Sequence, residues 1–380
     1  MTQPPDTTPL HVLELGTWLT TGGISRHIVG LRDWLRAHGH RVSVAGDPGE
    51  WINAANEPDF LDLPLISVGW RGGALPRRAI ASLRAAMLLR RWLKANRVDV
   101  MHAHDSTPAF VAWLARLGLN IPLVITYHGS EPERIAGFGR TARRANVTVT
   151  PSHMSARDLA TIGGVPESRL RVIGLGVDPV PAPDPAAVAA LRAKLLGAGG
   201  DRVILTLARL VPQKGIDILI EVAARVKAAH PGWRFVVAGD GADEAALKAR
   251  AEDRGVADTV LFVGRTPDPH LYLTAADLFL LTSRWEALPF TIVEAYRMGR
   301  PAVATACSGV VELIDDETGR VAPVGDVPAI AAALEEVLGD EALRQRLAAA
   351  ALARSREDRF DPDWVHPKFL ELYRDLAGRR

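Results

Sequence analysis

Short apolar runs alternate with longer amphipathic segments along the first half of the chain. The runs predict buried strands at 11–15, 40–46, 98–104, 122–128, 146–150 and 169–177. The segments between them predict helices at roughly 24–38, 76–96, 107–117 and 131–144. Buried strands that alternate with helices are typical of a parallel sheet covered on both faces.

The same alternation restarts after residue 200, with predicted strands at 202–209, 234–240, 259–265, 278–283 and 301–306. We therefore predict an α/β protein with two Rossmann-like, doubly wound domains that face each other across a cleft. The N-terminal domain is expected at 1–178 and the C-terminal domain at 201–358. The Pro-, Ala- and Gly-rich stretch 179–200 favours a linker, and 359–380 is expected to form a helix that packs back on the N-terminal domain.

Composition and charge narrow the class of protein. The chain has 380 residues, 48% of them apolar, and a net charge of +1, which argues against a general nucleic-acid binder. Its single cysteine, Cys307, cannot form an internal disulfide and fits a reducing compartment. The N-terminal residues lack a signal-peptide pattern, and no run of ~20 apolar residues is present. We expect a cytoplasmic protein.

The stretch RWEALPFTIVEAYRMG, residues 284–299, holds two glutamates with seven residues between them. Pro289 predicts a helix start, which places Glu286 in the preceding loop and Glu294 inside the helix. The first-turn amides, from Phe290 to Ile292, are expected to be unpaired. Leu288 cannot cap a helix, so capping explains the pair poorly. The spacing leaves open whether the glutamates are an acid and a base or a clamp on ligand hydroxyl groups.

Cations and glycines mark two other strand ends. Arg209 and Lys214 flank the loop before a helix that begins near Ile216. Because a helix N-terminus already favours anions, two cations there indicate an anionic ligand. Gly22 and Gly23 open the first helix, although the run is not the G-x-G-x-x-G of dinucleotide-binding proteins.

A pair of histidines lies on one predicted strand. His102 and His104 are two positions apart, so their side chains point to the same face. A metal site would need a third ligand, which the sequence does not supply nearby. Packing at the end of the strand is the favoured interpretation.

Taken together, these motifs resemble the retaining glycosyltransferases of family four, which share the two-domain architecture called GT-B. The resemblance covers nearly the whole chain, and E-x7-E at 286–294 is its most specific element. The matching elements are Arg209 and Lys214 in ARLVPQKG, Gly22-Gly23, His128 in TYHG, Gly241 in VVAGDGAD and Arg265 in FVGRTPD. Many relatives have Gly-Phe-Gly where this chain has Ala287-Leu288-Pro289, in a loop that is expected near the sugar.

The resemblance implies transfer of a sugar from a nucleotide-diphosphate sugar with retention at the anomeric carbon. It implies a hexosyltransferase-type enzyme without a cofactor, which uses a UDP-sugar rather than a GDP-sugar. The expected acceptor is a glycan or a lipid-linked molecule, as in the synthesis of cell-envelope polysaccharide. Metal independence is expected, because the one Asp-x-Asp triplet, at 361–363, is placed to start the last helix.

Roles for single residues follow from the same resemblance. Arg209 and Lys214 would hold the diphosphate, Glu286 the donor sugar and Glu294 the ribose. His128 would lie near the donor sugar and acceptor. The catalytic set is thus Glu286, His128, Arg209 and Lys214. The donor-binding set is Gly22, Gly23, Gly241, Arg265, Leu288, Pro289, Phe290, Thr291 and Glu294.

The segment 71–98 carries eight lysines or arginines and no acid. Read as a helix, it places Arg77, Arg84 and Arg91 in one stripe, with Lys94 and Arg90 beside it. Ile80, Leu83 and Met87 share this face, while Leu88, Leu89, Trp92 and Leu93 can face the sheet. Residues 77–94 could dock on an anionic membrane at its inner face, or they could form a solvated basic surface.

Three other classes share parts of this pattern. A nicotinamide oxidoreductase would use Rossmann-like domains, and Asp47 ends the second strand as a ribose-binding acid does. A two-lobed solute-binding protein would share the cleft but needs an export signal. An epimerase or another enzyme of the GT-B fold would share the whole architecture.

Overall fold

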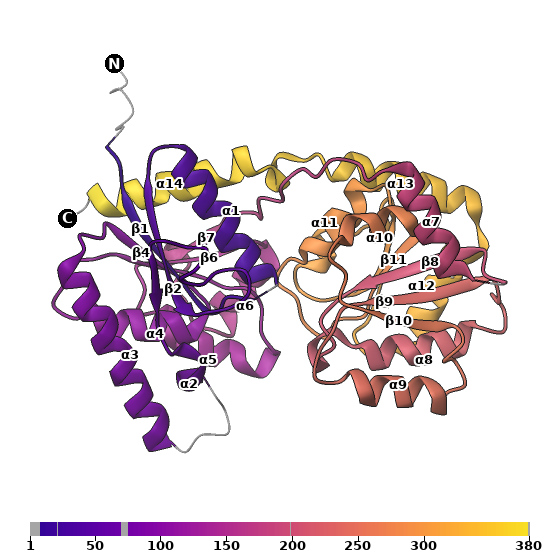
Figure 1. Cartoon of the computed structure of the whole chain (residues 1–380), viewed down its shortest axis with the longest axis horizontal. Coiled ribbons are helices and arrows are strands. Elements are labelled where there is room, and N and C mark those ends of the chain that lie inside the picture. The colour runs from indigo at the N-terminus through magenta and orange to yellow at the C-terminus, as the bar shows by residue number, and fades with distance from the viewer. Residues whose placement is uncertain (1–7, 21, 70–74, 198, 379–380) are drawn as a thin grey trace. The chain divides into compact units, whose positions relative to one another are not determined.

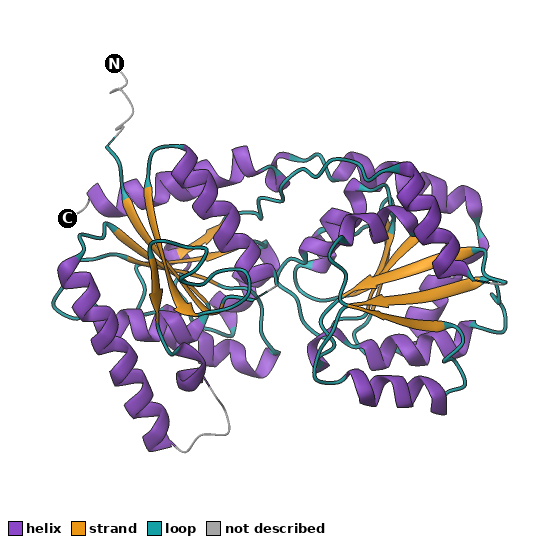
Figure 2. Ribbon diagram, in the orientation of Figure 1, coloured by secondary structure: helices purple, strands orange, loops and turns teal. Residues whose placement is uncertain are grey.

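The computed structural model describes residues 8–20, 22–69, 75–197 and 199–378. The chain forms two compact units, one spanning Met1–Asp178 and Asp361–Arg380 and the other Pro179–Phe360 (Figure 1). Each unit contains a parallel sheet with helices on both faces (Figure 2). The predicted α/β class with two Rossmann-like sheets is confirmed.

The first unit holds a seven-stranded sheet in the order β3-β2-β1-β4-β5-β6-β7. Its strands are β1 (His11–Trp18), β2 (Arg41–Asp47), β3 (Phe60–Asp62), β4 (Val100–His104), β5 (Leu123–Thr126), β6 (Val147–Thr150) and β7 (Leu170–Val172). The chain starts in the centre of the sheet and winds first toward one edge and then toward the other. The order therefore reverses between β1 and β4, and ligands of such sheets bind at this reversal, at the carboxyl ends of the strands.

Two apolar layers cover this sheet. One face packs against the helices α2 (Leu65–Gly69), α3 (Leu75–Ala95), α4 (Ser106–Ala115), α5 (Pro132–Ala142) and α6 (His153–Thr161). The other face packs against α1 (Gly23–Ala37) and the last helix, α14 (Pro362–Gly378). The last helix thus joins the first unit although the whole second unit, Pro179–Phe360, lies between them in the sequence, and Phe369 and Tyr373 are fully buried in the core of the first unit.

The second unit holds a six-stranded sheet in the order β10-β9-β8-β11-β12-β13. Its strands are β8 (Arg202–Leu207), β9 (Trp233–Ala238), β10 (Val260–Gly264), β11 (Leu278–Leu281), β12 (Ala302–Thr305) and β13 (Gly319–Ala322). Its helices are α7 (Pro185–Leu196), α8 (Ile216–Val226), α9 (Glu244–Asp253), α10 (Pro269–Ala275), α11 (Phe290–Arg297), α12 (Val327–Gly339) and α13 (Glu341–Arg354). Here the order reverses between β8 and β11.

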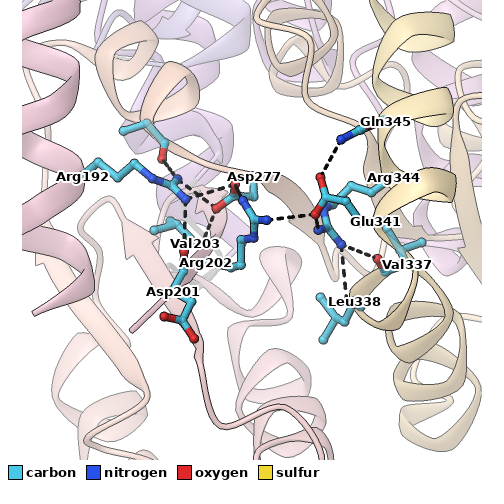
Figure 3. Close-up of polar contacts among 11 residues, drawn as sticks. Arg192, Asp201, Arg202, Val203, Asp277, Val337, Leu338, Glu341, Arg344 and Gln345 are labelled. Atoms are coloured by element: carbon cyan, nitrogen blue, oxygen red, sulfur yellow. Dashed lines mark hydrogen bonds and ion pairs between the residues drawn. The ribbon is translucent and has the colours of Figure 1, made fainter. Parts of the chain in front are cut away.

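The expectation of a linker at 179–200 is wrong for most of this stretch, because Pro185–Leu196 form α7. Asp184 caps the helix by accepting hydrogen bonds from the amides of Ala186 and Ala187, Pro185 fits the first turn, and alanines and leucines favour the helix that follows. Arg192 of α7 then pairs with Asp277 at 2.9 Å, which also receives Arg202 of β8 at 3.3 Å (Figure 3). The proline-rich composition is that of a connection, but Ala and Leu decide the local structure.

Two short strands, β3 and β13, were not predicted from the sequence. Both are edge strands of three and four residues, too short for a clear apolar period. As expected, the last helix starts at the triplet Asp361-Pro362-Asp363. The Asp361 carboxylate accepts a hydrogen bond from the Asp363 amide at 2.9 Å. Among the described residues, no helix has both the length and the apolar character needed to span a membrane.

Candidate active site

In the second unit, the candidate site lies at the carboxyl ends of β8 and β11, the two strands between which the order reverses. The β8–α8 connection carries Lys214, and the β11–α11 connection carries Glu286. Lys214 Nζ lies 2.5 Å from Glu286 Oε1, and the Ser283 hydroxyl donates to the same oxygen at 2.7 Å. The structure therefore brings together two residues that are 72 positions apart.

Side-chain contacts lock the two loops together. The Arg284 guanidinium donates to both carboxylate oxygens of Asp217, at 2.9 and 2.7 Å, and to the carbonyl of Pro212 at 2.7 Å. The Gln213 amide donates to the carbonyl of Trp285 at 3.0 Å. Burial would raise the pKa of Asp217, but the hydrogen bonds and the charge of Arg284 together lower it, so this pair stays charged near neutral pH.

Gly215 sets the angle between the 3₁₀ turn Pro212–Lys214 and α8. Its φ is 61°, in the left-handed region, and a Cβ there would lie 2.1 Å from the carbonyl oxygen of Thr282. The Thr282 hydroxyl also donates to the Gly215 carbonyl at 2.8 Å. The glycine thus lets the loop that carries Lys214 approach the end of β11.

The sequence suggested that the two cations await a negative ligand. The structure corrects this for Lys214, whose anion is Glu286 of the same chain, both side chains being largely buried. Arg209 differs, because its side chain is exposed and has no hydrogen-bond or ion-pair partner among the described residues. An arriving anion would therefore meet one unpaired cation and one that already has a partner.

Two residues of the predicted donor-binding set, Gly241 and Arg265, follow the strands β9 and β10. Gly241 allows the β9–α9 loop to pass close to the β8–α8 loop, since a Cβ there would lie 2.2 Å from the carbonyl oxygen of Leu210. The Leu210 amide donates to the carbonyl of Asp240 at 2.7 Å, which fixes the same approach. Arg265, just beyond β10, is exposed.

The helix α11 begins at Phe290, with Pro289 as its N-cap residue and no side-chain cap. The Ile292 amide donates to the Pro289 carbonyl at 3.3 Å, so the expectation that it is unpaired is wrong: the first turn tightens and uses it. Leu288 and Pro289 are buried, whereas Phe290 and Thr291 are half-buried. Direct contact with a ligand is therefore easier for Phe290 and Thr291.

Glu294 lies one turn inside α11 and is 3% exposed. Its carboxylate is 3.6 Å from the Nε2 atom of His270, at the start of α10. The two glutamates thus have different neighbours: a lysine and a hydroxyl for Glu286, an imidazole for Glu294. Two unlike environments argue against a symmetrical pair of carboxylates.

In the first unit, Gly22 and Gly23 open α1. Gly22 is the N-cap residue, has no side-chain cap bond, and its carbonyl accepts from the Arg26 amide at 3.0 Å. A Cβ at Gly22 would meet nothing within 4 Å. The fold itself therefore does not require glycine at position 22.

His128 follows β5 and belongs to a buried polar cluster. Its Nε2 lies 3.0 Å from Nδ1 of His104, and Nε2 of His104 lies 2.6 Å from the Glu14 carboxylate on β1. Burial would raise the pKa of Glu14, but the charges and hydrogen bonds of His102 and His104 outweigh it and lower this pKa to about 2. Burial and the neighbouring imidazoles lower the pKa of His104 to about 4 and that of His128 well below the usual value.

The second histidine of β4, His102, lies in the same cluster. Its Nδ1 is 2.7 Å from the Tyr373 hydroxyl of α14, and its Nε2 is 2.7 Å from the hydroxyl of Thr126. Burial, followed by the charge of Glu14, raises the pKa of Tyr373. Hydrogen bonds among β1, β4, β5 and α14 thus hold the cluster together.

The expectation that His102 and His104 lack a third potential metal ligand is wrong. Two groups of side chains have ligand atoms within 4.8 Å of one another: His27, His104 and His128, and Glu14, His102 and His104. The partners come from distant parts of the chain, which sequence spacing cannot reveal. Both nitrogens of His104 are nevertheless already used in hydrogen bonds, to Glu14 and to His128.

The basic helix expected at 76–96 is α3. Arg77, Arg84, Arg91 and Lys94 are exposed along it, as are Ile80, Leu83 and Met87. Two details differ from the expectation. Arg90 donates to the carbonyls of Ala115 and Leu117 at the end of α4, and Leu88 is 39% exposed, so it does not face the sheet.

Comparison with known proteins identifies the family. The model of the Glycosyltransferase Family 4 domain matches residues 21–180, and that of Glycosyl transferases group 1 matches residues 188–354. The lipopolysaccharide core biosynthesis glycosyltransferase LpsE of Rhizobium meliloti is 30% identical over 307 residues, 78% of this chain and 86% of that protein. The chain belongs to the glycosyltransferases of family four.

Two further relatives align along most of the chain. Glycogen synthase of Mycobacterium tuberculosis is 28% identical over 94% of this chain and 92% of its own length. Phosphatidyl-myo-inositol mannosyltransferase of Mycobacterium leprae is 27% identical over 94% of both. The expectation of a hexosyltransferase-type glycosyltransferase is confirmed, and the alternative of a nicotinamide oxidoreductase is set aside.

Solved structures share the GT-B fold. Anabaena Alr3699/HepE, in complex with UDP and glucose, has a TM-score of 0.79 at 21% identity and covers 96% of this chain and 100% of its own. WaaG, a glycosyltransferase involved in lipopolysaccharide biosynthesis, has a TM-score of 0.76 at 18% identity, covering 95% and 99%. The expected GT-B architecture is thereby confirmed.

Sequence reasoning missed several residues of this glycosyltransferase's candidate site. Ser283 had a signal, since it ends the predicted strand 278–283 three positions before Glu286. His270, Glu14 and His27 had none, because each meets its partners only through the tertiary fold.

Proposed function

We propose that this glycosyltransferase transfers a hexosyl group from a nucleoside-diphosphate sugar with retention at the anomeric carbon and without a metal ion. The proposed donor carries UDP rather than GDP, and the acceptor is a glycan or a lipid-linked molecule. The observation that carries the proposal is the contact between Lys214 and Glu286 at the strand ends where ligands of such sheets bind, with the exposed Arg209 on the same loop as Lys214.

Arg209 and Lys214 are proposed to provide the positive charge that a metal ion provides in other transferases. Cleavage of the donor leaves a diphosphate anion and an oxocarbenium-like sugar, so charge on the leaving group must be stabilised. Arg209 and Lys214 are proposed to hold the diphosphate. Lys214 then shares its hydrogen bonds between phosphate and Glu286, which keeps the Glu286 carboxylate directed at a hydroxyl group of the donor sugar.

The nucleoside is proposed to bind beside α11. Glu294 accepts hydrogen bonds from the ribose hydroxyls, while Gly241 and Arg265 lie near the base, and His128 and the Gly22-Gly23 amides serve the sugar and phosphates. Support for a UDP donor comes from Anabaena HepE, whose structures contain UDP and UDP-glucose. Support for a lipid-linked acceptor comes from the phosphatidyl-myo-inositol mannosyltransferase among the relatives.

A thermal-shift screen of UDP-, GDP- and ADP-sugars tests the donor, because a ligand bound only by the native state raises its stability. We expect the largest shift with a UDP-sugar. Transfer assays follow, with EDTA in one arm and NMR of the product's anomeric configuration as the readout of retention. Loss of activity in EDTA with rescue by Mg²⁺ or Mn²⁺ would overturn metal independence.

The variant Lys214→Ala tests whether this lysine binds the diphosphate of the donor. It should weaken binding of the nucleoside diphosphate, whereas Lys227→Ala, which removes a lysine paired with Asp258 at the surface, should not. Equal affinity of both variants for the nucleoside diphosphate would count against the assigned role of Lys214.

The acceptor side is proposed to include an anionic membrane surface, contacted by α3. Arg77, Arg84, Arg91 and Lys94 are exposed on this helix beside Ile80, Leu83 and Met87, which are 66%, 56% and 61% exposed. The helix carries no acidic residue, so its charge complements anionic lipid headgroups while the apolar side chains can enter the interface. Such a peripheral position would bring a lipid-linked acceptor to the enzyme.

A further inference from the structure

The buried cluster around His128 contains more groups than the proposed reaction uses. Glu14, His104 and His128 form a chain of two hydrogen bonds, at 2.6 and 3.0 Å, across β1, β4 and the end of β5. Glu14 and His104 are both 0% exposed, whereas His128 is half-buried. The chain therefore leads from the interior of the first unit to a residue that solvent or a ligand can reach.

Hydrogen-bond chemistry fixes the direction of this chain. An ionised carboxylate only accepts, so the Nε2 atom of His104 must carry the hydrogen that points to Glu14. The Nδ1 atom of a neutral His104 is then an acceptor, and the Nε2 atom of His128 must donate to it. The remaining nitrogen of His128, Nδ1, is left with a lone pair. Among the described residues, none forms a hydrogen bond with this atom.

Neighbouring rings restrain the imidazoles in this arrangement. His27 packs edge-on against His104 and His128, with ring centroids 5.1 and 5.4 Å apart. The carboxylate is also close to the second histidine of β4, with Glu14 Oε2 at 3.2 Å from Nδ1 of His102. Replacing a buried charged group and its partners by apolar residues of similar volume often leaves stability unchanged or raises it, so stability alone does not account for a carboxylate at position 14.

We infer that Glu14 and His104 are positioning residues that hold His128 in the tautomer with hydrogen on Nε2, so that Nδ1 accepts a hydrogen bond from a sugar or acceptor hydroxyl. The ligand part of this inference rests on the proposed function, whereas the tautomer does not. A carboxylate that orients a histidine through its other ring nitrogen is a known device in enzymes and metal sites. Here a second imidazole lies between the two.

NMR of the full chain, with ¹⁵N-labelled histidine, tests the tautomer without any substrate. Ring-nitrogen shifts distinguish protonated from unprotonated atoms, and a His128→Gln spectrum assigns the signal among the 11 histidines of the chain. We expect hydrogen on Nε2 of His128 in the native protein. Hydrogen on Nδ1 instead overturns the inference, and this holds even if Glu14→Gln does not fold.

Glu14→Gln replaces the acceptor-only group by an amide that can also donate. Because this amide can donate as well as accept, hydrogen should then appear on Nδ1 in a measurable fraction of the His128 side chains, and turnover should fall about 10- to 100-fold with the donor KM changed less than about twofold. The matched control is Glu57→Gln, which alters another buried carboxylate of the same unit, paired with Arg32 and Arg36. The control should change neither the tautomer nor turnover.

Two further outcomes are decisive. An unchanged tautomer in Glu14→Gln contradicts the inference. So does saturable binding of one equivalent of Zn²⁺ with loss of the His104 and His128 signals, because a metal would take the lone pairs that the hydrogen bonds use. The expected tautomer, without transfer from any nucleotide sugar, supports the positioning chain and overturns the proposed function.

Discussion

At the scale of single residues, Lys214 and Glu286 already contact each other in the ligand-free protein. A diphosphate that binds here exchanges contacts rather than meeting bare charges, and part of its Coulombic gain is offset by loosening this pair. Arg209, exposed and unpaired among the described residues, carries no such cost. If the proposed function is correct, we expect Arg209 to make the first contact with the diphosphate and Lys214 to fix its final position.

The two glutamates should differ when each is replaced by alanine. Glu286→Ala should lower turnover more than donor affinity, because contacts made in the transition state appear in kcat. Glu294→Ala should weaken the donor and the free nucleoside diphosphate together, by about 1–3 kcal/mol for a lost charge-assisted hydrogen bond. Calorimetric titration with free nucleoside diphosphate, which has the ribose but no sugar, decides between them. Strong weakening by Glu286→Ala but not by Glu294→Ala would show that the roles are reversed.

Two glycines should respond oppositely to alanine. Gly22→Ala should leave stability nearly unchanged, since a Cβ there meets nothing within 4 Å, yet it should weaken donor binding if phosphates approach its backbone. Gly215→Ala should destabilise the second unit by about 1–3 kcal/mol, because its φ of 61° is strained for alanine and its Cβ would meet Thr282. Urea unfolding and donor titration of both variants measure this. A destabilised Gly22→Ala protein with normal donor binding would contradict the assignment.

At the scale of elements, the central strands were predictable and the edges were not. The strands at 100–104 and 278–281 are buried at every position and mostly apolar, so they stand out in the sequence. The edge strands β3 and β13 are short and partly exposed. In α7, helix propensity and a capping aspartate prevailed over a proline-rich context.

Contacts in the candidate sites could be predicted only where the contacting residues are close in the sequence. The E-x7-E spacing lies within one loop and helix, so it could be read directly. The contact of Glu286 with Lys214 spans 72 positions, and that of Tyr373 with His102 spans 271. Such contacts depend on the order of strands in the sheet and on where the last helix packs, which the apolar pattern alone does not determine.

The helix α3 provides a test at this scale. Changing Arg77, Arg84 and Arg91 to Glu should release the protein from anionic vesicles at low salt, because each basic residue near such a surface contributes on the order of 1 kcal/mol. Vesicle flotation measures the bound fraction. The charge-matched control changes Arg140, Arg157 and Arg171, which are exposed on other elements of the same unit. If the unaltered protein does not float with anionic vesicles, a soluble acceptor is favoured.

At the scale of the whole molecule, the described histidines whose pKa is lowered by burial all lie in the first unit. They are His11, His27, His40, His104, His128 and His366. In the second unit, arginine partners lower the pKa values of carboxylates such as Asp217 and Asp315 against the opposing effect of burial, and these carboxylates titrate at lower pH. The two units should therefore lose stability in different pH ranges.

The pKa of His366 shows in which direction, and by how much, acid changes the stability of the first unit. Burial lowers its pKa from 6.5 to about 4, against the opposing charges of Asp363, Glu14 and Asp361. Below pH 6.5 the imidazole of His366 binds a proton in the unfolded chain but not in the folded unit. The free energy of unfolding is therefore unaffected by this residue above pH 6.5 and decreases as the pH falls from 6.5 toward 4. By pH 5 the loss is about 2 kcal/mol for this residue alone.

Urea unfolding at pH 7 and pH 5 should thus separate the units. Seven of the nine tryptophans belong to the first unit, whereas the sole cysteine, Cys307, is buried in the second, so fluorescence and thiol labelling report different units. We expect the fluorescence transition to move to lower urea at pH 5 while labelling of Cys307 by a pyridyl disulfide moves little. His366→Gln should reduce the shift in fluorescence, and exposed His153→Gln should not. Equal shifts of both probes would mean that the buried imidazoles do not set the acid response.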